Sequence, residues 1–231
     1  MKVIIPARAG SKGIPRKNMM KVGGKTLVQL SIEHALQLTD EVYVNSEDDE
    51  ILEHAKEFGA IPYKRPMELA KDDTSLRDVI SEMVGKGRGV FGLMANIDDL
   101  LILLPTYPLR NVQQTGDFWK RYLRAKKLRG VPSALCCRPC DPPDLCVRLE
   151  DYCKSTPATD RLIYRRQERE LCVKLSHYLV ACDSKELYTL DDGFYAENTF
   201  LYPLTEKPID VDSEEDLQTA RRESSFRHWK I

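Results

Sequence analysis

The sequence predicts a doubly wound α/β fold with a mostly parallel sheet. Short apolar runs alternate with stretches in which apolar residues recur at helical spacing, which is the pattern of repeated β-loop-α units. The first run leads into a glycine-rich loop. Residues 100–104 form a wholly apolar run that ends at Pro105, as is typical of a central parallel strand. Ligands of such sheets bind at the carboxyl ends of the strands, so we expect the functional residues there.

Local signals place the individual elements. Thr26 is suited to cap a helix that carries an apolar stripe, and Ser46 is suited to cap a second helix that ends at Gly59. Thr74 or Ser75 is suited to cap a third. In chain order we expect strands at residues 2–7, 41–45, 61–64 and 100–104, and helices at residues 26–38, 46–59, 75–84 and 112–127.

The alternation breaks at residues 131–173, which are rich in proline, cysteine and charge. We interpret this stretch as an inserted subdomain or oligomerisation arm, with 145–153 as part of a hairpin. Regular signals resume afterwards, with strands expected at residues 178–181, 200–202 and 209–212 and a closing helix from about residue 213. The sequence therefore predicts one domain over residues 1–222 with the arm inserted in it, and a polar tail at 223–231.

The composition excludes several classes of protein. The 231 residues include 42% hydrophobic and 31% charged residues, ordinary values for a soluble globular chain. No apolar run approaches the roughly 20 residues that span a bilayer, so we expect no membrane partner and a cytoplasmic protein, or a nuclear one in a eukaryote. The cysteine count of seven is odd and nothing indicates export, so disulfides are not expected.

Charge is distributed unevenly along the chain. The first 32 residues hold seven cations and no acid, whereas the whole chain has a net charge of −1. A locally basic end on an acidic body favours a small polyanion over nucleic acid as the ligand, although a solvated basic face is the alternative. The cations are Lys2, Arg8, Lys12, Arg16, Lys17, Lys21 and Lys25.

The order of residues in this segment favours a phosphate site. Gly10 and Gly13 flank Ser11 and Lys12, and glycines let backbone N–H groups approach an anion closely. The Arg8 guanidinium is a planar fork suited to phosphate oxygens, and lysines add mobile charges that stabilise a phosphoryl transition state. The spacing is neither that of a Walker A loop nor that of the dinucleotide-binding fingerprint. We therefore expect a nucleoside triphosphate site in the first eighteen residues.

Residues 7–18 read Ala-Arg-Ala-Gly-Ser-Lys-Gly-Ile-Pro-Arg-Lys-Asn, which resembles the opening signature of the N-acylneuraminate (CMP-sialic acid) cytidylyltransferases. The resemblance implies a sheet of nucleotide-diphospho-sugar transferase type, CTP as the nucleotide, and a homodimer in which the 135–170 arm reaches the partner's active site. It implies a nucleotide site made of Ala7, Arg8, Gly10, Ser11, Lys12, Lys17, Asn18, Arg65, Ser75 and Thr106.

Two further segments carry the resemblance. Residues 65–75 are similar to the family's Arg-Pro-x-x-Leu-Ala segment with its following Asp and Ser, which implies that Arg65 and Ser75 line the nucleotide site. Taken alone, Arg65 reads as a surface arginine and Ser75 as a helix cap. Residues 103–110 are similar to the family's Leu-Gln-Pro-Thr-Ser-Pro-Leu-Arg, at the end of the expected central strand. Taken alone, that segment is a proline-rich strand exit.

The sugar half of the site departs from the family pattern. Leu104 stands where the family has glutamine, and Tyr107 where it has serine. The family's Arg-x-Asn-Gly-Ala segment reads Lys-Leu-Ser-His-Tyr at residues 174–178, and its His-Pro-x-Lys segment reads Asp-Pro-Pro-Asp from residue 141. By position, the sugar-binding residues are Leu104, Tyr107, Arg165, Lys174, Ser176 and His177. For His177, a packed or surface position is the alternative.

Ile209-Asp210-Val211-Asp212 resembles the family's Ile-Asp-Ile-Asp. On a strand, residues two apart share a face, so Asp210 and Asp212 present paired carboxylates suited to Mg²⁺ or Mn²⁺. The alternative is that Asp212 or Ser213 caps the final helix together with Asp216. Elsewhere, Cys137 and Cys140 have zinc-site spacing, but without paired histidines buried thiols are the expectation.

These observations predict a cytidylyltransferase that joins CMP from CTP to the anomeric hydroxyl of an acidic sugar. The resemblance implies that the catalytic residues are Arg8, Lys12, Lys17 and Asp212, with the metal held by Asp210 and Asp212. A second hypothesis keeps the chemistry with another acceptor, such as a Kdo-like acid, a heptose phosphate or a phosphonate. A third is a nucleotide-binding homologue without catalysis.

Overall fold

The computed structural model describes residues 1–227 apart from residue 12 and the segments 86–98, 141–146, 152–153 and 158–171. The strands are β1 (Lys2–Pro6), β2 (Lys21–Val22), β3 (Lys25–Thr26), β4 (Val42–Ser46), β5 (Ile61–Lys64), β6 (Asp99–Ile102), β7 (Ser133–Cys140), β8 (Val147–Asp151), β9 (Lys154–Pro157), β10 (Cys172–Asp183) and β11 (Phe200–Pro203). The α-helices are α1 (Leu27–Leu36), α2 (Asp49–Glu57), α3 (Leu76–Met83), α4 (Val112–Arg129) and α5 (Glu214–Arg227), and short 3₁₀ turns include η1 (Lys17–Met19) and η5 (Ser184–Thr189).

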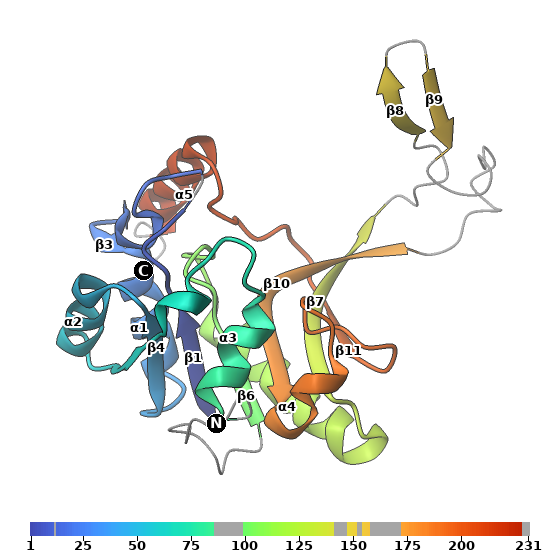
Figure 1. Cartoon of the computed structure of the whole chain (residues 1–231), viewed down its shortest axis with the longest axis horizontal. Helices are drawn as coiled ribbons and strands as arrows, with labels where there is room; N and C mark the ends of the chain where they lie inside the picture. The colour runs from blue at the N-terminus through green and yellow to red at the C-terminus, as the bar shows by residue number, and fades with distance from the viewer. Residues whose placement is uncertain (12, 86–98, 141–146, 152–153, 158–171, 228–231) are drawn as a thin grey trace.

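A seven-stranded sheet forms the centre of the molecule, in the order β11-β7-β10-β6-β1-β4-β5 (Figure 1). β1 pairs in parallel with β4 and β6, β4 with β5, and β7 with β11, while β10 is antiparallel to both β6 and β7. The predicted mostly parallel α/β sheet is therefore confirmed. Because β6, β1, β4 and β5 point the same way, the residues that follow them gather along one edge of the sheet.

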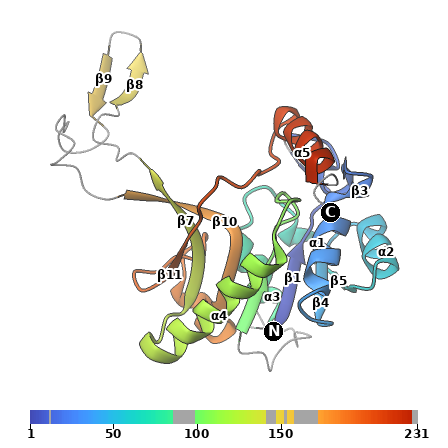
Figure 2. The same ribbon diagram turned by 180° about the vertical axis from the view of Figure 1, so that it is seen from behind.

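Side-chain alternation along β1 separates two hydrophobic layers. Val3 and Ile5 pack with α1, α2 and α4 on one face, whereas Ile4 packs with α3 and η5 on the other. Figure 2 shows α4 across the face opposite α3. All three β1 side chains are fully buried, which explains why this strand reads as a continuous apolar run. Among the described residues, the structure contains no helix of the length and apolarity needed to cross a membrane.

The helix starts are set by side-chain caps. The Thr26 side chain accepts a hydrogen bond from the Gln29 N–H, and the Ser75 side chain accepts one from the Asp78 N–H, as the sequence predicts. The predicted Ser46 cap for α2 is wrong: Asp48 caps this helix, and the Ser46 hydroxyl instead accepts the Asp48 N–H at 3.1 Å. Gly59 follows the helix with φ of 86°, a conformation that glycine adopts without strain, so the predicted end is confirmed.

The expected arm at 131–173 begins too early. Residues 133–137 are buried in β7, which pairs with β10 and β11 inside the main sheet, so the insertion begins only beyond these residues. A hairpin does form within the arm, between β8 and β9, and β7 and β10 both extend from the sheet toward it (Figure 1). The remaining residues of the arm lie outside the described part of the chain.

The C-terminal segment returns to the N-terminus and packs on it. Residues 209–212 form no strand, contrary to expectation; they are joined to the chain after β6 by the Val211 N–H, which donates to the Thr106 carbonyl at 2.8 Å. Val211 is fully buried in a small cluster with Ile14 and Leu27, which holds α5 against the β2–β3 hairpin. α5 continues to Arg227, so residues 223–227 of the expected polar tail are helical.

Candidate nucleotide site

A cleft of about 260 Å³ opens where three parallel strands end. Its walls come from the residues that follow β1, β5 and β6 and from the start of α3, and they carry four cations and one acid. The lining residues are Pro6, Arg8, Gly10, Ser11, Lys17, Asn18, Arg65, Leu69, Lys71, Asp72, Thr74, Leu76, Val79, Leu104, Pro105 and Thr106. The structure thus brings together seven of the predicted nucleotide-binding residues, from positions more than ninety apart in sequence: Arg8, Gly10, Ser11, Lys17, Asn18, Arg65 and Thr106.

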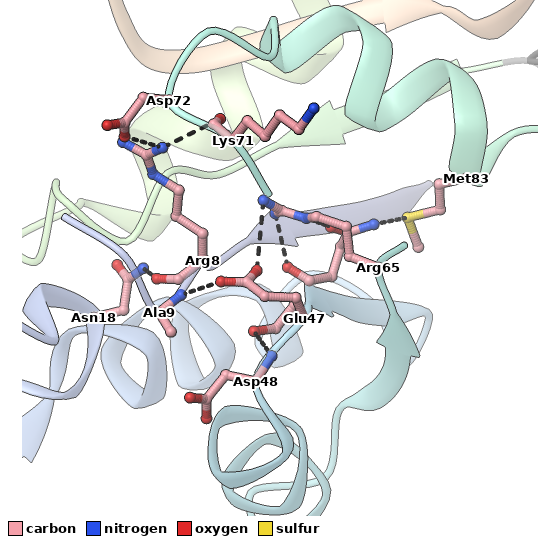
Figure 3. A network of polar contacts seen from close by, with 11 residues as sticks. Arg8, Ala9, Asn18, Glu47, Asp48, Arg65, Lys71, Asp72 and Met83 are labelled. Carbon is pink, nitrogen blue, oxygen red and sulfur yellow. Dashed lines mark hydrogen bonds and ion pairs between the residues drawn. The ribbon is translucent and has the colours of Figure 1, made fainter. Parts of the chain in front are cut away.

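The N-terminal loop leaves the sheet just before Arg8. Ala7 still belongs to the sheet edge, because its N–H donates to the Asn45 carbonyl at 2.9 Å and its side chain is fully buried. Arg8 reaches across the cleft, where its guanidinium donates to the Asp72 carboxylate at 2.8 Å (Figure 3). Arg8, predicted to bind phosphate, therefore lies in the cleft, where the exposed Asp72 in the loop before α3 holds it.

Arg65 is buried at the back of the cleft, with 4% of its surface exposed. Its Nε donates to the Asn45 side-chain oxygen at 2.6 Å, and a second N–H donates to the Asn45 carbonyl at 3.1 Å. Burial lowers the pKa of Arg65, an effect opposed mainly by Glu47, whose carboxylate lies 3.8 Å from the guanidinium (Figure 3). Sequence reasoning missed Glu47, which reads as an ordinary acid at the start of the helix expected from residue 46.

Lys17 joins the N-terminal loop to the C-terminal segment. Its ammonium donates to the Asp212 carboxylate at 2.7 Å. The backbones approach so closely here that a Cβ placed on Gly13 would lie 2.3 Å from the Asp212 carbonyl oxygen. Glycine at position 13 thus serves close packing between segments two hundred residues apart. The N-terminal loop and the segment of the predicted metal ligands Asp210 and Asp212 are therefore neighbours.

Asp210 and Asp212 lie in different surroundings. Asp212 is exposed and pairs with Lys17, whereas Asp210 is half-buried with its Oδ1 fully buried and, within the described structure, without a hydrogen-bond partner. The alternative role in capping is also present: Ser213 and Asp216 exchange hydrogen bonds at the start of α5. In the described part of the chain, no group of three or more His, Cys, Asp or Glu residues is placed to hold a metal.

The loop after β6 is organised by Arg110. Its guanidinium donates to the Leu104 carbonyl at 2.6 Å, the Tyr107 carbonyl at 2.8 Å and the Tyr178 carbonyl at 3.1 Å. Burial lowers the pKa of Arg110 to about 10, so the side chain stays protonated at neutral pH. The last residue of the Pro-Thr-Tyr-Pro-Leu-Arg segment is therefore a structural cation that shapes the loop.

Three residues assigned to the sugar half lie near this loop. Leu104 lines the cleft, while Tyr107 is buried beneath it against the ring of Tyr178. Burial raises the pKa of the Tyr107 phenol well above its usual value, and the nearby Asp210 carboxylate raises it further, whereas a hydrogen bond with Ser176 opposes the shift. Tyr107, Ser176 and Asp210 therefore form one polar group next to the cleft.

The other sugar-site predictions have a different outcome. Lys174 is exposed on β10, where its backbone lies opposite that of Arg138 in β7, and it does not line the cleft. The His177 ring contacts the Gly193 carbonyl at 3.0 Å, a packed position like the alternative considered from the sequence. Ser75 caps α3, and its neighbours Thr74 and Leu76 line the cleft instead. Lys12 and Arg165 lie outside the described residues.

The Cys137–Cys140 pair is not arranged as zinc ligands. Residues three apart on a strand point to opposite faces, and Cys137 is accordingly buried whereas Cys140 is exposed. Burial raises the pKa of Cys137 and raises that of the neighbouring Cys136 to about 12, so both remain thiols at neutral pH. These two residues are packed core side chains.

The sheet, with a cation-lined cleft at the carboxyl end of β1, defines the α/β class of nucleotidyltransferase folds. A solved structure of CMP:2-keto-3-deoxy-manno-octonic acid synthetase complexed with CTP matches with a TM-score of 0.67 and 19% identity, covering 98% of both chains. The 4-diphosphocytidyl-2C-methyl-D-erythritol synthase of Anaerococcus prevotii matches with a TM-score of 0.60 and 15% identity, covering 97% of this chain and 95% of the other. At these identities the likeness establishes the fold.

Sequence comparison finds similarity to cytidylyltransferases. The cytidylyltransferase family model matches residues 2–98. The pseudaminic acid cytidylyltransferase of Campylobacter jejuni serotype O:2 is 45% identical over 127 residues, 52% of each chain. The CMP-N,N'-diacetyllegionaminic acid synthase of Legionella pneumophila is 28% identical over 91% of this chain and 97% of its own length, and an N-acylneuraminate cytidylyltransferase of Escherichia coli is 28% identical over 94% and 50%. These relatives are named as cytidylyltransferases or CMP-sugar synthases, and the chain spans about half the length of several of them.

Proposed function

We propose that the chain is a cytidylyltransferase that transfers CMP from CTP to the anomeric hydroxyl of an acidic nonulosonic sugar and releases pyrophosphate. The observation that carries the proposal is the cleft at the end of β1, where Arg8, Lys17, Arg65 and Lys71 face one space. A triphosphate needs such a concentration of positive charge in a site partly shielded from water. The relatives named for pseudaminic, legionaminic and sialic acids support CTP and an acidic sugar as substrates.

In the proposed reaction, the sugar hydroxyl oxygen attacks the α-phosphorus and the bond to the bridging oxygen of pyrophosphate breaks. Negative charge develops on the leaving pyrophosphate, so cations that are already fixed in place lower the barrier. Arg8 and Lys17 are suited to this role because both reach the cleft from the N-terminal loop. Each is held by a carboxylate in the structure, Asp72 or Asp212, that a triphosphate would replace.

Two carboxylates near the N-terminal loop support a divalent cation in the proposed reaction. The buried Oδ1 of Asp210 receives no hydrogen bond in the described structure, and Asp212 offers an exposed carboxylate two residues away. Mg²⁺ prefers one or two carboxylates with phosphate and water completing its shell, so we propose that Asp210 and Asp212 hold Mg²⁺ or Mn²⁺. When bound there, the ion would orient the phosphates and withdraw charge from them.

The acceptor we favour is a nonulosonic acid of the pseudaminic type, which the names of two Campylobacter relatives support at 45% and 48% identity. Three residues after β6 line the cleft, and two of them, Leu104 and Pro105, are apolar; the third is Thr106. An apolar wall suits a sugar with deoxy carbons better than a fully hydroxylated one. We further propose that the protein acts as a homodimer through the arm that β7 and β10 carry, and that it works in the cytoplasm.

Pyrophosphate release tests the proposed function. Each of the four ribonucleoside triphosphates would be combined with pseudaminic, legionaminic, N-acetylneuraminic and 2-keto-3-deoxy-manno-octonic acids in the presence of Mg²⁺. We expect release only with CTP, and fastest with pseudaminic acid. Release with the octonic acid alone would support the second hypothesis of a different acceptor. CTP binding without release in any combination would support a non-catalytic homologue.

A further inference from the structure

The peptide group that joins Arg8 to Ala9 is held at both ends by side chains. Its carbonyl oxygen, on Arg8, accepts a hydrogen bond from the Asn18 side-chain amide at 2.8 Å. Its N–H, on Ala9, donates to the Glu47 carboxylate at 2.7 Å (Figure 3). Because the peptide group is planar and rigid, bonds at both ends fix its orientation and prevent it from flipping. This is the second peptide group past the last sheet hydrogen bond of the segment, which Ala7 makes.

The same Glu47 carboxylate also faces Arg65. Its Oε2 is fully buried and lies 3.8 Å from the Arg65 guanidinium, and within the described structure no hydrogen bond reaches it. Only 9% of the Glu47 side chain is exposed. A buried carboxylate is costly unless a cation offsets it, so the pair with Arg65 stabilises Glu47 in this position. The remaining Arg65 contacts, to Asn45, fix the guanidinium relative to β4.

Glu47 therefore links the ends of three adjacent strands. It follows β4, its first oxygen holds the loop after β1, and its second oxygen faces the residue after β5. Gly10 and Ser11, which line the cleft, come directly after the fixed peptide group. The direction in which their N–H groups point thus depends on how the Arg8–Ala9 peptide is oriented. A loop that has no sheet partner of its own thus gains a defined geometry from two side chains, those of Glu47 and Asn18.

We propose that Glu47 is a positioning residue that holds the loop after β1 and Arg65 in the orientation that receives a triphosphate. The inference rests on the proposed function for its ligand, but the geometry it describes belongs to the protein alone. Two variants separate its two contacts. Glu47→Gln keeps an oxygen for the Ala9 N–H and loses the charge opposite Arg65, whereas Glu47→Ala loses both. Glu53→Gln and Glu53→Ala, on the exposed face of α2, are matched controls of the same chemistry.

Two measurements test the proposal. The first is hydrogen exchange of the Ala9 amide in the protein without nucleotide. A bond to a carboxylate lost from the folded state corresponds to faster exchange by about tenfold or more. We expect that acceleration in Glu47→Ala, a smaller one in Glu47→Gln and none in the Glu53 variants. The second is CTP affinity by calorimetry with Mg²⁺. We expect binding weakened by about tenfold in Glu47→Ala, partly restored in Glu47→Gln, and unchanged in the controls.

The outcomes distinguish this inference from the proposed function. If the wild-type protein binds no CTP, the proposed nucleotide is wrong, and Ala9 exchange still decides the role of Glu47. If the wild type binds CTP and both Glu47 variants bind it within twofold of wild type, Glu47 is not a positioning residue. Unchanged Ala9 exchange in Glu47→Ala would overturn the proposal in either case. Thermal unfolding of each variant, with exchange at amides elsewhere in the sheet, separates a local effect at Ala9 from a general loss of stability, which would accelerate exchange throughout the sheet.

Discussion

Replacing Gly13 by alanine tests the close approach between the N-terminal loop and the C-terminal segment. The added Cβ would lie 2.3 Å from the Asp212 carbonyl oxygen, a distance that side-chain carbons do not reach. The obstacle is backbone, so the two segments must separate. Overpacking of this kind costs about 1–3 kcal/mol, to which weakening of the Val211 hydrogen bond to Thr106 adds about 1 kcal/mol.

The expected loss is measurable by thermal unfolding. In a domain of this size, 1 kcal/mol lowers the melting temperature by about 2–4 °C, so the combined loss of about 2–4 kcal/mol predicts that Gly13→Ala melts about 4–16 °C below wild type. Gly10→Ala is the matched control, because a Cβ on Gly10 meets nothing within 4 Å. That variant should melt at or slightly above the wild-type temperature, since alanine restricts the unfolded chain. Equal melting temperatures for the two variants would refute the observed packing of Gly13 on Asp212.

Three further predictions follow from the same structure. Arg110→Lys removes the planar fork that holds three carbonyls, so we expect the free energy of unfolding in denaturant to fall by about 2–5 kcal/mol. A fall below about 0.5 kcal/mol would contradict the role of Arg110 in holding the loop after β6. Burial lowers the pKa of His34 from 6.5 to about 4. Between these values the unfolded state binds more protons, so stability falls as the pH falls through this window, by at most about 3 kcal/mol. His34→Gln should flatten that part of the pH profile measured by urea unfolding, and an unchanged profile would exclude His34 as the cause. Asp212→Asn should weaken Mn²⁺ binding measured by electron paramagnetic resonance and abolish Mg²⁺-dependent turnover; full retention of both would refute the metal assignment.

Features decided by neighbouring residues could be predicted from the sequence. The strand at 2–7, the glycine-rich loop and the caps Thr26 and Ser75 each depend on a few consecutive side chains, and all are present. The predicted start of α2 at Ser46 is wrong because Asp48, two residues on, is equally suited to cap a helix. The structure resolves the choice through tertiary pairing, which extends β4 through Ser46 and moves the helix start onward.

Features decided by distant segments could not be predicted. Residues 133–137 end in two cysteines and are followed by prolines, so they read as part of an irregular arm, yet burial between β10 and β11 makes them a core strand. Glu47 gains its importance from Ala9 and Arg65, which meet it only when β1, β4 and β5 pair. In the same way, His177 follows the expected sugar-site spacing, but its ring is packed on Gly193. The spacing of His177 along the chain does not show that Gly193 lies against its ring.

The most direct test of the account is detection of the product itself. Purified protein would be incubated with CTP, pseudaminic acid and Mg²⁺, and the mixture followed by phosphorus nuclear magnetic resonance and mass spectrometry. The account predicts a CMP-sugar phosphodiester that accumulates in step with pyrophosphate and disappears when Lys17 is replaced by alanine. Pyrophosphate formed together with free CMP, with no sugar ester at any time, would contradict transfer to the sugar and with it the proposed function of the cleft.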